Sequence, residues 1–86
     1  MQWKEVTFIL RGRIRKAVLK ALDSPKTATI IAKELDTHRS TVSRILGVLD
    51  EKGFVLCLDK GEPYNRYYHR TKQGDKALQE INKLQS

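Results

Sequence analysis

Two guanidinium and three hydroxyl side chains gather in the middle of the chain, within the segment DTHRSTVSRILGVLDEKGFV (residues 36–55). A guanidinium group can bind phosphate or the edge of guanine, and small hydroxyl side chains allow close approach to a hydrogen-bonding surface. The chemistry that this segment offers is recognition of a polyanion. The five residues are Arg39, Ser40, Thr41, Ser43 and Arg44.

The sequence offers no comparable set of groups for catalysis. It has no nucleophile–base pair with recognisable spacing, no paired-carboxylate signature and no glycine-rich phosphate loop. Cys57 is the only cysteine, which excludes an intrachain disulfide and a cysteine-rich zinc site. His38 and His69 do not complete a metal site with it. We therefore expect no enzyme, no cofactor and no metal, and we interpret Cys57 as a buried small hydrophobe.

A helix over about residues 39–52 must position the polar side chains. Val42, Ile45, Leu46 and Leu49 recur at the spacing of one helical face, which docks the helix on a core. The short polar and basic residues then face away from that core. The opposite face shows Ser40, Arg44 and Gly47.

Other elements flank this helix in the order α-α-α-β-β-α. Before it come a basic amphipathic helix over 8–22, which could begin near residue 3, and a helix over 28–35. After it, two segments rich in β-branched and aromatic residues predict strands over 54–59 and 66–71, joined by the turn KGEPYN. A last helix follows over 72–86. The boundary residues that we expect are Thr27 and Thr71 as N-caps, Pro25 and Asp36 as helix ends, and Gly53 as a C′ residue.

The predicted architecture is therefore α+β, a winged helix-turn-helix with three helices, a two-stranded β-wing and a C-terminal helix. The length of 86 residues suits one domain, residues 1–86. The net charge of +7 and the sequence pI near 9.8 favour a polyanionic partner. We expect a cytoplasmic protein, because no apolar run approaches the ~20 residues of a membrane span and the N-terminal residues lack signal-peptide features.

A family resemblance rests on two stretches of this sequence. TATIIAKELDTHRSTVSRILGVLDEKGFV (27–55) resembles the core of prokaryotic winged helix-turn-helix transcriptional regulators of the ArsR/MarR type. RYYHRTKQGDKAL (66–78) resembles their second wing strand and the following helix. The chain departs from the usual pattern at the turn, where it has Asp36 and Thr37, and at His38 and Gly47. Two interpretations of Gly47 stay open: a close approach to DNA, or a neutral surface substitution.

The resemblance implies a sequence-specific regulator that binds double-stranded DNA. The recognition helix, about 39–52, would lie in the major groove, and the wing, about 60–66, on the backbone or in the minor groove. No effector-binding domain is visible, so a small-molecule effector stays an open question. The expected DNA-binding residues are Arg39, Ser40, Thr41, Ser43, Arg44, Thr27, His38, Lys60, Asn65 and Arg66.

The resemblance also implies a homodimer, whose two recognition helices would lie about 34 Å apart. Apolar residues near both ends exceed the needs of a small core and are the expected dimer contacts: Trp3, Val6, Leu10, Ala77, Ile81 and Leu84. Two alternatives remain. One is a winged-helix module for protein–protein interaction, which predicts an acidic or apolar recognition face. The other is an RNA-binding module of a larger assembly, which predicts recognition by shape and 2′-hydroxyls.

Overall fold

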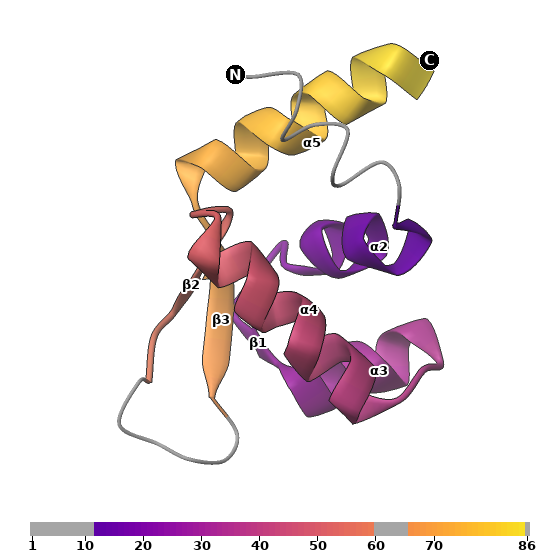
Figure 1. Cartoon of the computed structure of the whole chain (residues 1–86), viewed down its shortest axis with the longest axis vertical. Helices are drawn as coiled ribbons and strands as arrows, with labels where there is room; N and C mark the ends of the chain where they lie inside the picture. The colour runs from indigo at the N-terminus through magenta and orange to yellow at the C-terminus, as the bar shows by residue number, and fades with distance from the viewer. Residues whose placement is uncertain (1–11, 60–65, 86) are drawn as a thin grey trace.

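The computed structural model describes residues 12–59 and 66–85, which form four helices and a three-stranded antiparallel sheet (Figure 1). The predicted α+β winged helix-turn-helix is confirmed. In chain order the elements are α2 (Arg13–Ala21), β1 (Lys26–Thr27), α3 (Ala28–Leu35), α4 (Arg39–Glu51), β2 (Val55–Cys57), β3 (Tyr67–Arg70) and α5 (Lys72–Gln85).

The two helices of the helix-turn-helix, α3 and α4, have the bounds that local signals predict to within one residue. Thr27 caps α3, because its side-chain oxygen accepts a hydrogen bond from the Ile30 N–H at 3.2 Å. Asp36 ends α3 in the left-handed conformation, with φ 53° and ψ 52°. Three residues, 36–38, separate the helices and set the tight turn between them.

The end of α4 is a Schellman motif built on Gly53, whose φ is +82°. The Gly53 N–H bonds to the carbonyl of Asp50 at 3.0 Å, and the Phe54 N–H bonds to the carbonyl of Leu49 at 2.9 Å. These bonds bring Phe54 back under the helix, where its side chain is fully buried. Phe54 therefore precedes strand β2, whereas the sequence pattern predicts that it begins this strand.

Helix α2 differs from the predicted helix over 8–22. It begins at Arg13, because Gly12 occupies the N-cap position with extended backbone angles; residues 1–11 lie outside the described range. The helix turns Val18 toward the core, fully buried. Leu19 is fully buried, whereas Ile14 is 38% exposed.

The sheet has one strand more than the predicted two-stranded wing. Its order is β1-β3-β2, and β1 pairs with β3 through Lys26 opposite Tyr68 and Thr27 opposite Tyr67. A two-residue strand has no alternation pattern, so the sequence alone could not reveal it. In β2 and β3, Cys57 lies opposite Tyr68. The predicted turn at 60–65 lies outside the described residues.

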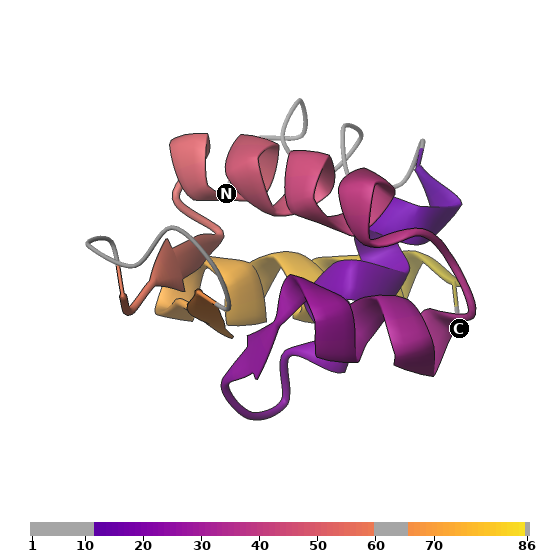
Figure 2. The ribbon, with the colours of Figure 1, turned by 90° about the horizontal axis from the view of Figure 1, so that it is seen from below.

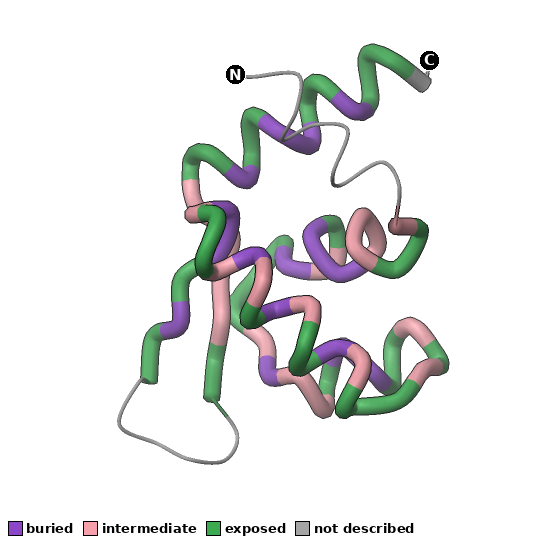
Figure 3. Tube along the Cα trace, viewed as in Figure 1, coloured by how far each residue is buried: buried purple, intermediate pink, exposed green. Residues whose placement is uncertain are grey.

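One hydrophobic core joins α2, α3, α4, α5 and the sheet. Buried positions follow the inward faces of these elements (Figure 3). Seen from the second direction, α4 and α3 lie on different levels (Figure 2), and α2 packs against both of them. No helix in the described part of the chain is long and apolar enough to cross a membrane.

The start of α5 is fastened to the end of α4 through Thr71 and Gly74. The Thr71 hydroxyl donates to the Gly53 carbonyl at 2.7 Å and accepts from the Gly74 N–H at 3.1 Å. Its backbone N–H donates to the Phe54 carbonyl at 3.1 Å. Gly74 itself is buried, and a Cβ atom there would overlap with the same Phe54 carbonyl oxygen.

Replacing Gly74 with alanine is expected to lower the free energy of unfolding by about 1–3 kcal/mol, because the backbone of Phe54 must move away. The control is Gly47→Ala, since a Cβ atom at that exposed helical position meets no other atom within 4 Å. This control should raise stability by about 0.5–1 kcal/mol. Denaturant unfolding measures both values. Equal effects of the two substitutions would contradict the close packing of α5 on Phe54.

A second prediction concerns Lys26, whose Nζ lies 2.9 Å from Glu34 and 3.2 Å from Asp23. The hydrogen bond to Glu34 raises the pKa of Lys26 above its ordinary value of 10.5. The unfolded chain therefore loses this proton first, and the free energy of unfolding should fall as the pH rises above 10.5.

Lys26→Met should make this decline shallower than in the wild type, when denaturant unfolding is followed between about pH 8 and 11. Lys33→Met serves as the control, because Lys33 is exposed on α3 and forms no ion pair within the described residues. Identical slopes for wild type and Lys26→Met would contradict the role of the Lys26 ion pairs.

Candidate nucleic-acid interface

Helix α4 separates its apolar and polar residues as the sequence predicts. Val42, Leu46 and Leu49 are fully buried, and Ile45 is half-buried against the core. The outward face, which we call the α4 crest, consists of Ser40, Arg44 and Gly47, all exposed. Because the buried face fixes the helix on the core, the crest is presented to solvent on a rigid support.

The predicted DNA-binding residues of α4 are on the surface. His38, Arg39 and Ser43 are exposed like the crest, and Thr41 is half-buried. Within residues 12–59 and 66–85, neither Arg39 nor Arg44 forms an ion pair. Both guanidinium groups therefore keep their charge uncompensated by the described carboxylates, which suits an anionic ligand.

The flanks of α4 open onto two different grooves. We call the first the wing-side groove, a polar hollow of about 220 Å³ that brings together predicted site residues from three elements. Arg39 and Ser43 enter it from α4, and Arg66 enters it from the start of β3. The lining residues are Thr27, Ala28, Thr29, Arg39, Ser43, Arg66 and Tyr68.

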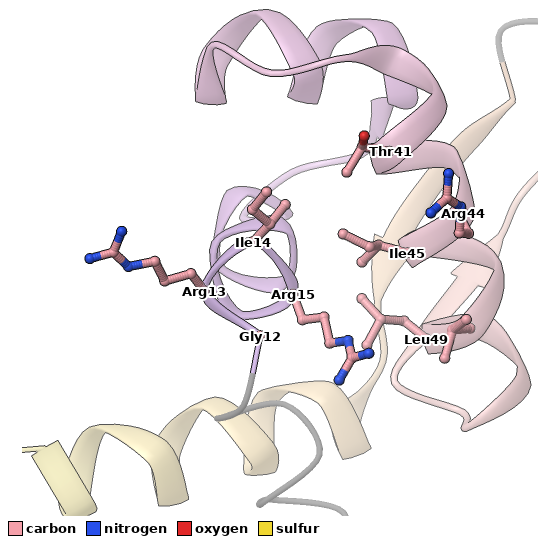
Figure 4. Close-up of a pocket in the computed structure, with 9 residues that line it drawn as sticks. Gly12, Arg13, Ile14, Arg15, Thr41, Arg44, Ile45 and Leu49 are labelled. Carbon is pink, nitrogen blue, oxygen red and sulfur yellow. The ribbon is translucent and has the colours of Figure 1, made fainter.

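The second groove lies between α2 and α4 and has a volume of about 790 Å³. Thr41 and Arg44 line it together with apolar residues of both helices. Figure 4 shows Ile45 and Leu49 pointing from α4 toward α2, while Arg13 points away. The sequence places Ser43 and Arg44 side by side on one helix, but the structure assigns them to grooves on opposite flanks.

Thr27 has a structural task that the sequence also predicts. It is only 5% exposed, and its side-chain oxygen accepts the capping hydrogen bond of α3. Sequence reasoning missed its neighbour Thr29, which is half-buried and lines the same groove. The hydroxyl pair in the segment TAT, at the start of a predicted helix, was the signal that could have found it.

Tyr68 is the second residue that sequence reasoning did not assign to the site. As strand alternation predicts, the two tyrosines separate: Tyr67 is 41% exposed, and Tyr68 packs against the core. Burial raises the pKa of Tyr68 above its usual 10.0, and the nearby Arg66 guanidinium opposes this rise. Tyr68 thus reaches from the core to a guanidinium group at the wing.

Other predicted site residues are placed as follows. Arg66 is exposed directly before β3, whereas Lys60 and Asn65 lie outside the described residues. Cys57 is buried, as expected. In the described part of the chain, no group of three or more His, Cys, Asp or Glu residues is arranged to hold a metal ion.

The predicted dimer contacts need a correction at the C-terminal helix. Ala77 and Ile81 are fully buried in the core of their own chain, so they present no surface to a partner. Their spacing indicated an apolar helix face but not what covers that face. Leu84, at 49% exposed, is accessible. Trp3, Val6 and Leu10 lie outside the described residues.

Known structures share this architecture at low sequence identity. BldR from Sulfolobus solfataricus, a transcriptional regulator, matches with a TM-score of 0.76 and 22% identity, over 93% of this chain and 63% of that one. The oxidized form of MarR from E. coli matches with a TM-score of 0.73 and 22% identity, over 93% and 60%. The MarR family transcription regulator SP03579 gives 0.72 and 22%, over 83% and 49%.

The chain therefore spans about half to just under two thirds of the length of these regulators. Comparison with curated protein sequences gives no match. A family model does match, and it covers nearly the whole chain, residues 3–86. The chain belongs to the family described as the HVO_A0261 N-terminal domain, and its fold is the MarR-like winged helix.

Proposed function

We propose that this protein is a sequence-specific transcriptional regulator that binds double-stranded DNA through α4. The observation that carries the proposal is the α4 crest with its flanks. They present small, polar and basic residues on a helix whose other face packs on the core. A major groove about 12 Å wide admits one α-helix, and arginine and hydroxyl side chains can read its base edges.

The residues divide into two roles in this proposal. Ser40, Thr41, Ser43 and Arg44 read bases, because they occupy the crest and the flanks beside it. Arg39 and His38 lie at the first turn of α4, where they suit contacts to phosphate. The wing, with Lys60, Asn65 and Arg66, lies along the backbone or in the minor groove.

The shared fold supports this assignment, since the matched solved structures are named transcription regulators. The net charge of +7 supports it further, because phosphate neutralisation supplies much of the affinity of such proteins for DNA. The alternative of a protein-interaction module predicts an acidic or apolar face. The described face of α4 is instead basic and polar at its N-terminal half.

The first test is an equilibrium titration of the protein, at several salt concentrations, with duplex DNA selected for binding from a random-sequence pool. Affinity should fall steeply with salt, and Arg44→Ala should weaken binding by about 1–3 kcal/mol. The matched control is Lys76→Ala, which removes one charge from an exposed position on α5. It should change affinity by less than about a factor of two, because it lies away from α4.

Circular dichroism establishes that each variant is folded before the titration. A folded wild type that does not bind duplex DNA at low salt would overturn the proposal. A preference for structured RNA over duplex DNA in the same titration would favour the RNA-binding alternative. Equal losses for Arg44→Ala and Lys76→Ala would show attraction by net charge without a site on α4.

We further propose that the protein acts as a homodimer, so that two copies of α4 meet successive turns of the duplex, about 34 Å apart. Light scattering should give twice the chain mass of 9.9 kDa. Leu84→Asp should lower the dimer fraction, because it places a charge on an exposed apolar position near the C-terminus. Lys76→Asp, also exposed on α5, is the control. A monomeric wild type across the accessible concentration range would contradict the dimer.

A further inference from the structure

The wing-side groove brings two arginine side chains together in one polar hollow. It lies where three elements meet, with Thr29 from α3, Arg39 and Ser43 from α4, and Arg66 before β3. Two of its lining residues are arginines, and none of them is an aspartate or a glutamate. A polar hollow of about 220 Å³ with this lining suits one tetrahedral oxyanion.

The spacing of the α4 residues fits the same purpose. Arg39 and Ser43 are four residues apart, so they lie on one side of the helix, one turn from each other. This side faces the sheet, whereas Arg44 faces the α2 groove. A DNA strand that passes between α4 and the wing would therefore meet Arg39 and Arg66 together, from two sides.

Tyr68 connects this groove to the interior. Its side chain lies against the core, and its strand position is opposite the buried Cys57. Its side chain lines the groove together with Arg66, an exposed residue whose guanidinium charge acts on the Tyr68 hydroxyl. A long arginine side chain loses much rotamer freedom when it binds a ligand. A tyrosine that already holds it reduces that loss.

We propose that the wing-side groove seats a single backbone phosphate of the DNA, held by Arg39 and Arg66, and that Tyr68 is the positioning residue for Arg66. This inference rests on the proposed function and assigns Arg66 to a phosphate beside α4. Thr29 supplies a further hydroxyl donor at the same seat. Tyr68 acts through Arg66 and makes no contact with a base.

The test compares Tyr68→Phe with Tyr67→Phe, which removes a hydroxyl from the exposed neighbour on the opposite face of the strand. Both changes keep the aromatic ring, so both variants should fold. Tyr68→Phe should weaken duplex binding about 2- to 10-fold, the range for loss of one hydrogen bond. Tyr67→Phe should leave the affinity unchanged.

Two further measurements distinguish a positioning role of Tyr68 toward Arg66 from a general effect on the stability of the protein. In an Arg66→Ala background, Tyr68→Phe should have no additional effect on affinity, because the group that it positions is absent. Arg39→Ala and Arg66→Ala should each reduce the slope of log affinity against log salt by about 0.9, the value for one lost phosphate contact.

Additive losses in the double variant, or equal losses for both tyrosine variants, would overturn the role of Tyr68. Unchanged salt slopes for Arg39→Ala and Arg66→Ala would overturn the phosphate seat. In either case, a wild type that binds duplex DNA and weakens with Arg44→Ala leaves the proposed function standing. A wild type that does not bind duplex DNA overturns both the seat and the function.

Discussion

The contact on which the arrangement of this domain depends is the one between Thr71 and the turn after α4. The Thr71 hydroxyl bonds the Gly53 carbonyl and caps α5, and its N–H bonds the Phe54 carbonyl. One residue thereby satisfies backbone groups at the end of one helix and at the start of another. Since β3 runs directly into Thr71, the same bonds fix β3 relative to α4.

Arg70 extends this junction to the first described helix. Its Nη1 donates to the Leu19 carbonyl at 2.9 Å, close to the C-terminal end of α2, and its Nε donates to Asp75 at 2.6 Å. A cation at the C-terminal end of a helix also interacts favourably with the helix dipole. Arg70 thus joins α2, β3 and α5 into one support. The α4 crest takes no part in these bonds, which leaves it available for a ligand.

The sequence predicts best those elements whose ends are set by capping residues in the same segment. The cap at Thr27, the left-handed Asp36 and the glycine at position 53 fix α3 and the end of α4. Pairing across the chain was not visible, because β1 exists only through its partners on β3. Burial of Ala77 and Ile81 likewise depends on what packs over α5. The same holds for the candidate site. The sequence identifies its residues on α4, but it does not show that they line two separate grooves, because these grooves form only where α2 and the sheet pack beside α4.

Substitutions in α4 have different effects on its buried face and on its exposed face. Its buried residues determine stability, and a large-to-small change at Leu46 would leave a cavity in the core. Its crest contributes little, and Gly47 even weakens the helix by about 1 kcal/mol relative to alanine. A Cβ atom at position 47 would meet nothing within the described chain, so packing there gives no reason for a glycine. The α4 crest can therefore be substituted without altering the fold, whereas Tyr68 both packs against the core and lines the wing-side groove.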